Sequence, residues 1–477
     1  MGSENLISVG FYGRRKLKTE YAEINSFNVV AALKEVLPSF TTNLAEIEYL
    51  HNYYKGMQPI LGKVKTVRPE INYKISVNRA NEIVSFKQGY LVGEPLQYVL
   101  RNDFKDYIDG IHKLNDFMLI QKKPRRDLQL ANWMYICGTA FRMVLPNPKY
   151  RLFDDEAPFT LKTLNPKTAF VVYNLSDDDE PVMGVKINIE KTPIEEKTVY
   201  NVYTKNMFFV IKDWEVKQAT PHILGNIPII EYPLNDDRLG AFEIVLPLLD
   251  AINVTASGRL DGVEQFINSL MKMKNADITT EDFEKLKDLG CIKIKDNGGN
   301  ADVEFMEQNL DQTQIQKLVD WEYDAVLTIV GMPNRNGGSS TSDTGAAVIM
   351  RDGWSDAESR AKDDEASFKD SETSFLKLVL RILDILTGVK LPLSGIDTRF
   401  TRRNYENIEQ KSTVLVAMLS SNKIHPKLAF EHCGMFTDPT LAYEMSKEYA
   451  EEQERKAQAQ KQTGQGDGNN GGNNGTN

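Results

Sequence analysis

The chain has 477 residues, of which 41% are apolar, so it can bury real cores, and we expect roughly two to four structural units. The formal charge of −10 and the isoelectric point near 5.3 argue against a protein that grips nucleic acid over its whole surface, because such binding needs clustered lysines and arginines. The three cysteines lie far apart, which predicts a reduced protein with neither a disulfide framework nor a zinc site. The N-terminus is polar and no apolar run reaches about 18 residues, so we expect neither a signal peptide nor a membrane span.

Residues 26–145 follow a mostly helical pattern that is interrupted by turns containing proline or glycine. The predicted helices are 27–37, 42–54, 79–89, 99–114, 115–121 and 125–138. From about 161 to 232 the pattern changes to short runs of β-branched and aromatic residues, which predict antiparallel strands. The clearest runs are 170–173, 183–189, 197–203 and 207–212. A helical layer followed by a β region is therefore expected.

Two helices with apolar faces come next, the first from about 242 to 274 and the second from 311 to Gly331-Met332-Pro333, where proline ends it. The first would be about 50 Å long. The insert between them is too short to bury a core alone, so the two helices are predicted to form a stalk that presents it at the far end.

The insert itself is predicted to contain a helix from Thr279 to Gly290 and a β-hairpin. Apolar residues alternate with polar ones on both sides of a turn that contains two adjacent glycines. The residues of this hairpin are Ile292, Ile294, Asn297, Gly298, Val303 and Phe305.

A small polar loop separates the stalk from a much longer helical pattern. The loop residues are Asn334, Arg335, Asn336, Gly337, Gly338, Ser339, Ser340, Thr341 and Ser342. Composition alone favours a plain linker, but the position between two ordered helices favours a contact function. From 344 to 388 apolar residues recur every seven positions, which predicts a rod of roughly 60 Å with a kink at Gly353. Its charged middle excludes a membrane span.

After Gly388 a turn-rich join leads to predicted helices at 406–421, 427–432 and 440–460. The final residues, 464–477, are glycine, asparagine and glutamine almost throughout, and we expect them to be disordered.

No motif argues for catalysis, a cofactor or a metal. Gly56 to Val64 resembles a phosphate-binding loop but has the wrong glycine spacing and lacks the final hydroxyl residue. Two basic clusters, Arg14-Arg15-Lys16 with Lys18 and Lys122-Lys123-Pro124-Arg125-Arg126, could touch phosphates, although solvated loops are the more economical interpretation. The acidic groups Asp177-Asp178-Asp179-Glu180 and Asp363-Asp364-Glu365 are interpreted as solvated faces.

Nearly the whole chain resembles the portal proteins, the head-to-tail connectors of tailed bacteriophages, in the branch found in long-tailed phages of Gram-positive hosts. The order and spacing of several segments carry the resemblance. They are Tyr53-Tyr54-Lys55-Gly56-Met57-Gln58-Pro59-Ile60, Arg68-Pro69-Glu70-Ile71-Asn72, Asn81-Glu82-Ile83-Val84, Gly89-Tyr90-Leu91-Val92-Gly93-Glu94-Pro95, Ile227-Pro228-Ile229-Ile230-Glu231-Tyr232-Pro233, Arg238-Leu239-Gly240, Asp261-Gly262-Val263-Glu264-Gln265-Phe266 and Phe400-Thr401-Arg402-Arg403.

The resemblance implies an α+β, mainly α, ring subunit with a wing, a two-helix stem, an α/β clip, a long kinked helix and a helical crown. The implied divisions are an N-terminal arm (1–25), wing (26–240), stem helix (241–274), clip (275–310), second stem helix (311–332), tunnel loop (333–343), long wing helix (344–388), crown (389–460) and disordered tail (461–477).

The resemblance also implies a function and partners. The chain would form a dodecameric ring at one capsid vertex of the virion, assembled in the host cytoplasm, with double-stranded DNA in its channel. The terminase large subunit would supply the motor, and capsid, scaffold and head-completion or adaptor proteins would be further partners. The subunit itself would not be an enzyme, and no membrane would be involved. The tunnel loop would line the channel, and the hairpin of the clip would face the terminase.

A channel that lets a polyanion slide should lack deep phosphate sites, and an acidic ring with a small polar constriction meets that condition. Arg335 is the only formal cation of the loop, and repetition around a ring would give a shallow positive belt. A ring-forming structural adaptor that never contacts DNA is the alternative that the sequence leaves open.

Overall fold

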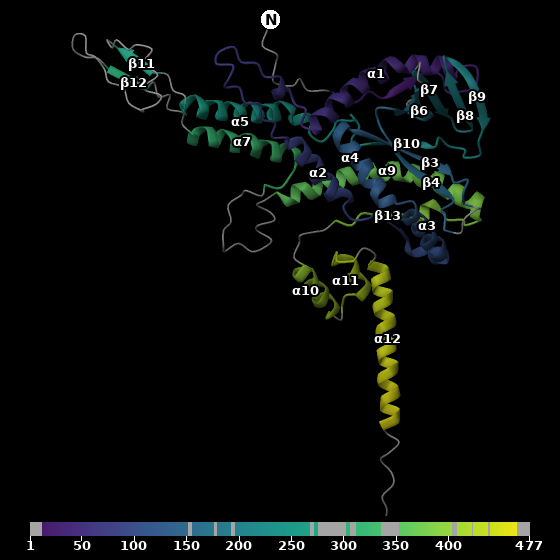
Figure 1. The fold of residues 1–477 in the computed structure, drawn as a ribbon. Helices are drawn as coiled ribbons and strands as arrows, with labels where there is room; N and C mark the ends of the chain where they lie inside the picture. The colour runs from purple at the N-terminus through teal and green to yellow at the C-terminus, as the bar shows by residue number, and fades with distance from the viewer. Residues whose placement is uncertain are drawn as a thin grey trace, which may run out of the picture.

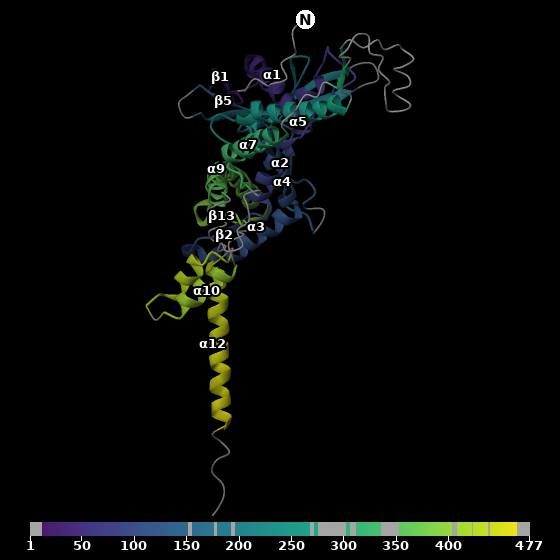
Figure 2. The ribbon, with the colours of Figure 1, turned by 90° about the vertical axis from the view of Figure 1, so that its left-hand side faces the viewer.

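The computed structural model describes residues 12–150, 155–175, 179–191, 196–267, 271–274, 302–305, 312–334, 353–402, 408–421, 423–436 and 439–464. It is an α+β, mainly α fold, as predicted. A body of helices and sheets carries a two-helix arm on one side, and a separate group of helices lies below it (Figure 1). Figure 2 shows the same three parts from the side of the arm.

The predicted β region forms two sheets. The larger has the order β1-β5-β6-β7-β8-β9, and the smaller has the order β10-β3-β4. The strands are β1 (Leu17–Thr19), β3 (Thr139–Pro146), β4 (Phe159–Leu164), β5 (Ala169–Asn174), β6 (Pro181–Lys191), β7 (Glu196–Tyr203), β8 (Met207–Lys212), β9 (Glu215–Pro221) and β10 (Ile229–Pro233). Pairing is antiparallel as predicted, except that β1 joins β5 in parallel. The smaller sheet uses β3, which follows the helical layer directly.

The helical layer differs from the prediction in three places, one of which is that the helices predicted at 99–114 and 115–121 are joined in a single helix, α3 (Ile108–Ile120). The two helices predicted on either side of Pro38 are one continuous helix, α1 (Val29–Tyr54). Proline has no N–H, so the carbonyl of Lys34 loses its helical hydrogen bond. Because Lys34 and Pro38 are both exposed, water can satisfy that carbonyl. The predicted helix at 99–114 is wrong at its start. Gln97–Leu100 forms strand β2 against β13 (Ile396–Arg399), and α3 follows as Ile108–Ile120. Because β13 is about 300 residues away along the chain, the local sequence of β2 gives no sign that it will pair as a strand. The other helices of the layer are α2 (Arg79–Val92) and α4 (Lys123–Cys137).

The arm consists of α5 (Leu246–Ile267) and α7 (Gln312–Val330), which lie side by side with the strand pair at the far end (Figure 1). The predicted extension of the first helix to Lys274 is wrong. Met271–Lys274 is strand β11 and pairs antiparallel with β12 (Asp302–Phe305), so cross-strand hydrogen bonding replaces the last helical turn.

The long helical pattern forms α9 (Trp354–Thr387). Gly353 has φ +78° and directly precedes the first residue of α9, so it is a left-handed residue at the start of this helix, and the predicted kink there stays a prediction. The rest of the predicted rod, 344–352, lies outside the described residues. Phe368, Phe375 and Ile382 are buried as the seven-residue pattern predicts, and α9 packs against β10, β3 and α2. The helix therefore runs through the body and contacts both kinds of layer.

The C-terminal helices are α10 (Ile408–Leu419), α11 (Pro426–His432) and α12 (Pro439–Gly464), close to the predicted positions. Most of α12 projects away from the body (Figures 1 and 2). The predicted disordered residues after Gly464 lie outside the described residues.

A cluster of buried charges joins α9 to the helical layer, to the smaller sheet and to the β2–β13 pair. Glu372 of α9 accepts from Lys123 Nζ at 2.8 Å, from Arg142 at 3.2 Å and from the Tyr232 hydroxyl at 2.7 Å, and it also accepts from Tyr98. These four donors match the roughly four acceptor positions of a carboxylate. Burial by itself raises the pKa of Glu372, but the charges of Lys123 and Arg142 outweigh that effect and hold the pKa well below its usual range.

Asp127 completes the cluster because it contacts the same two cations, with 2.7 Å to Lys123 Nζ and a short contact to Arg142. Two cations and two carboxylates, all buried, therefore neutralise each other. Removing one member of such a group leaves an uncompensated charge out of water.

We predict that Glu372→Gln lowers the free energy of unfolding by about 3–5 kcal/mol, because Lys123 and Arg142 then share Asp127 alone. Urea denaturation followed by tryptophan fluorescence measures the change. Asp370→Asn, an exposed change on the same helix, is the control and should stay within about 0.5 kcal/mol. A loss below about 1 kcal/mol for Glu372→Gln would show that the cluster does not hold α9 in place.

Candidate functional site

The arm is the element that carries the predicted functional segments, so its construction decides where they lie. Thr255 Oγ1 of α5 lies 3.4 Å from Glu322 of α7, and Arg259 donates to Gln316 at 2.6 Å. Residues later in α5 therefore contact residues earlier in α7, so the two helices run antiparallel and form the stalk that the sequence predicted. Glu322 is buried between the helices, and burial raises its pKa.

A segment that we call the strap, residues 63–77, lines α5 on another face. The backbone N–H groups of Tyr73, Ile75 and Val77 donate to side chains of Asp261 (2.7 Å), Ser257 (3.0 Å) and Asn253 (2.8 Å). Two residues of extended chain rise about 6.6 Å, and four residues of helix rise about 6 Å. Alternate strap residues can therefore bond to every fourth helix residue, and this matched spacing fixes α5 to the body.

Asp261 also carries the electrostatic part of this contact. Its carboxylate receives Lys63 Nζ at 2.6 Å and lies 3.6 Å from Lys65 Nζ. Burial raises the pKa of Asp261, but the hydrogen bonds from Lys63 and from the Tyr73 N–H, together with the lysine charges, bring it below its usual value. The resemblance to the portal family included the segment that starts at Asp261, and the strap contact gives that residue a physical role.

The base of the predicted tunnel loop is closed. At the end of α7, Gly331 has φ +67°, and the N–H groups of Gly331 and Met332 donate to Thr328 and Leu327. This arrangement is a Schellman motif, which needs a left-handed residue. A Cβ on Gly353 would lie 3.8 Å from the Cα of Pro333, so the two ends of 335–352 meet at one point. The segment leaves and re-enters the fold at the root of the arm.

The structure places only some of the predicted site residues. Asn334 lies at the loop base, where its amide donates to Asp324 at 2.9 Å. Val303 and Phe305 lie in β12, opposite Met273 and Met271. Two sets fall outside the described residues: Arg335, Asn336, Gly337, Gly338, Ser339, Ser340, Thr341 and Ser342 from the loop, and Ile292, Ile294, Asn297 and Gly298 from the hairpin.

One flank of α7 is apolar and uncovered. Trp321 is 62% exposed, and Leu318 and Ile329 on the same side of the helix are 46% and 39% exposed. Val254 of α5 is also partly exposed. Sequence reasoning treated α7 only as a stalk helix and missed this flank, although the spacing of these apolar residues beside the buried ones was the available signal.

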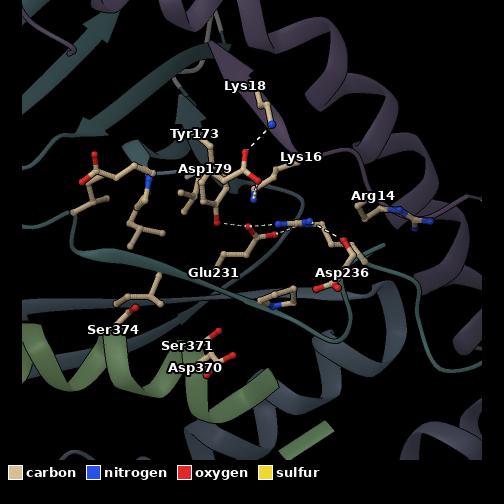
Figure 3. Close-up of a pocket in the computed structure, with 18 of the residues that line it drawn as sticks. Arg14, Lys16, Lys18, Tyr173, Asp179, Glu231, Asp236, Asp370, Ser371 and Ser374 are labelled. Carbon is tan, nitrogen blue, oxygen red and sulfur yellow. Dashed lines mark hydrogen bonds and ion pairs between the residues drawn. The ribbon is translucent and has the colours of Figure 1, made fainter. Parts of the chain in front are cut away.

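A second region, a cavity of about 1170 Å³, opens between the N-terminal segment, β10 and α9. In Figure 3 Lys16 and Lys18 point toward Asp179, and Asp370, Ser371 and Ser374 approach from α9. The ion pairs measure 2.7 Å and 2.6 Å, and hydrogen bonds from the two lysines lower the pKa of Asp179 to about 2. Positive and negative groups alternate around the wall, so no single ligand charge is favoured.

The structure corrects the interpretation of the basic clusters as solvated loops. Arg14 is buried and lies 2.7 Å from Glu243 and 3.0 Å from Glu46. Lys123 is buried in the Glu372 cluster. The acidic groups are also not wholly solvated, because Asp364 accepts from Tyr135 at 2.9 Å. Local sequence cannot show this, because each partner comes from a distant element.

Within the described ranges, no group of three or more His, Cys, Asp or Glu side chains could hold a metal ion. Likewise, no helix among those the structure describes is long and apolar enough to cross a lipid bilayer.

The described residues thus form a body held by buried charges and an arm whose apolar flank is uncovered, and such a flank is typical of a surface that contacts another protein. Residues 33–459 match the family model of phage portal proteins like SPP1 Gp6, so the chain belongs to that family and has a portal, or head–tail connector, role. A chain from the neck of an empty GTA particle, computed with C6 symmetry, is 10% identical with a TM-score of 0.42, covering 75% of this chain and 90% of that one. No curated protein sequence matches.

We predict that acid loosens the strap through Asp261. Because its pKa is lowered in the folded protein, its stabilising contribution is complete above the ordinary carboxyl pKa, about 4, and disappears as the pH falls through the lower folded value. Hydrogen exchange of the Tyr73 amide measures this loosening of the strap, with amides inside α4 as the internal reference.

The variant Asp261→Ala should speed exchange at Tyr73 roughly ten- to a hundredfold at neutral pH, since a hydrogen bond to a charged acceptor contributes about 1.5–3 kcal/mol. Ser257→Ala, which removes the neutral acceptor for Ile75, is the matched variant and should have a smaller effect. Equal effects of the two variants would refute the charge argument.

Proposed function

We propose that the chain assembles into a closed dodecameric ring at one capsid vertex, through which double-stranded DNA is packaged by the terminase and later ejected. The proposal includes contacts with the terminase large subunit, with capsid and scaffold proteins and with a head-completion or adaptor protein, in the virion. The subunit would perform no reaction of its own. Membership of the portal family supports this proposal, and the observation that carries the ring is the apolar flank of the arm.

The flank is more than the usual scattered exposure of apolar side chains. Trp321, Leu318 and Ile329 recur on one side of a helix, and Val254 of the neighbouring helix α5 is also partly exposed. Large aromatic side chains at such positions are the typical anchors of interfaces. Contact between this flank and a different face of the next copy is heterologous, and a heterologous contact closes into a ring when the rotation permits. Arms packed in this way would surround a channel.

The proposed channel suits a polyanion that must slide. The chain is acidic overall, and the loop that leaves the root of the arm is small and polar, with Arg335 as its only cation before Asp343. Deep basic sites would hold phosphates and stall movement, whereas one shallow cation per copy would steer the duplex without reading bases. We place Asn334 to Ser342 at this constriction.

The tip of the arm is the proposed docking site for the terminase and, later, the connector proteins. The β11–β12 pair lies at the far end of α5 and α7, and Val303 and Phe305 belong to it. A two-stranded sheet cannot be stable by itself in water, so this element needs neighbours. Copies in a ring, or a docked partner, would supply them. The remaining docking residues of the proposal are Ile292, Ile294, Asn297 and Gly298.

We predict that Trp321→Glu prevents ring assembly, because it places a charge at the centre of the apolar flank. Native mass spectrometry of the purified protein should show monomers or short oligomers. Trp321→Phe keeps an apolar ring and should retain the closed assembly. Circular dichroism that matches the parent chain would show that the subunit still folds, and a closed ring of Trp321→Glu would contradict the arm interface.

We predict that replacing Gly337 and Gly338 with leucine leaves ring assembly intact and reduces DNA packaging, because bulk is added where the channel is narrowest. A packaging assay with purified terminase and proheads measures DNA protected from nuclease. Replacement by alanine is the matched control and should retain most packaging. Unchanged packaging by a ring with leucines would favour the alternative, an adaptor without DNA contact.

A further inference from the structure

The C-terminal unit, residues 408–464 with α10, α11 and α12, has very little core of its own. Among its described side chains, the buried apolar ones are Ala429, Phe430 and Cys433. The contacts that hold it together are mainly those between α11 and its two neighbours. Units of this size normally need a larger core, so the unit lacks an adequate share of buried surface.

The same unit exposes several large apolar side chains on its surface. Leu441, Met445 and Tyr449 follow one another at four-residue spacing along α12 and are 50%, 63% and 64% exposed. On α10, Val416 and Leu419, three residues apart and so on the same side of the helix, are 62% and 41% exposed. From Met445 onward every described side chain of α12 is exposed, and the helix stands clear of the body (Figure 1). An apolar stripe on a projecting helix indicates a partner.

The charges of the two surfaces are complementary. Between 444 and 454, α12 carries five glutamates and one lysine. Glu448 borders the apolar stripe and is exposed. The region of α10, α11 and their connection carries Lys411, Lys423 and Lys427 against Glu431 among its described side chains. A second copy of this unit thus offers both apolar side chains and the opposite charge.

We propose that α12 of one copy packs against α10 and α11 of the neighbouring copy, with Met445 and Tyr449 covering Val416 and Leu419. This contact is a second inter-subunit interface, separate from the arm, and it rests on the proposed ring. It is heterologous, because the two surfaces differ, and the same rotation that repeats the arm contact repeats this one.

Another surface of the same chain could also cover part of the apolar stripe on α12. A groove of about 520 Å³ between β2 and α3 is lined by Ile108 and Leu119 and, at its edge, by Leu441. Only the first turn of α12 reaches it, whereas Met445 and Tyr449 are not among its lining residues. The groove can therefore account for the start of the stripe but not for its exposed remainder.

Cysteine cross-linking in the full-length chain tests the proposal. The variant Val416→Cys/Met445→Cys is treated with a short bis-maleimide and run on a denaturing gel, while native mass spectrometry records the assembly. The controls are Val416→Cys/Ala450→Cys, whose second cysteine lies on a different side of α12, and the parent chain with its native Cys137, Cys291 and Cys433. Both new positions of the test variant are exposed, so the fold should tolerate them.

The proposal predicts a ladder of covalent oligomers for Val416→Cys/Met445→Cys, at least tenfold stronger than for either control. A closed ring that yields no ladder, or only internally cross-linked monomer, overturns this interface and leaves the proposed ring standing. A protein that stays monomeric at all concentrations overturns both.

Discussion

The fold depends on keeping the Glu372 carboxylate neutralised inside the body. That carboxylate contacts Lys123 from α4, Arg142 from β3, and hydroxyls from β2 and β10. A single residue of α9 therefore joins the smaller sheet, the β2–β13 pair and the helical layer. Leaving any of these charges unpaired costs several kcal/mol, and the elements can therefore meet in few other ways. In the ring that we propose, this rigidity would let the subunit keep its shape under the load of packaged DNA.

The arm is also held rigidly to the body. The strap fixes α5 through evenly spaced side chains, and α7 is packed against α5. Pro333, where the predicted tunnel loop begins, lies against Gly353 at the start of α9. Movement of α9 would consequently move the loop base and the arm together. Among the described residues, apolar surface is uncovered on the arm and on the C-terminal helices, and both surfaces suit a protein that completes its burial by assembling.

Sequence periodicity predicted the long elements well, because α5, α7 and α9 each bury a stripe at helical spacing. It failed where a distant partner decides the structure. Gln97–Leu100 is a strand because of β13, and Met271–Lys274 because of β12. Arg14 and Lys123 looked solvated because Glu243 and Glu372 are far away in sequence. Of the candidate site, the sequence located the loop root and the arm tip, whereas the exposure of Trp321 requires the three-dimensional packing of α5 and α7.

The central claim is that this chain is a ring-forming conduit for DNA. Electron-microscope class averages of the purified parent chain, with its mass measured by native mass spectrometry over a range of salt concentrations, test that claim most directly. The account predicts a closed dodecameric ring with an open central channel, in which the apolar flank of each arm packs against a different face of the next copy. A particle that stays monomeric or dimeric at every salt concentration, or a closed assembly with no central opening, would contradict it.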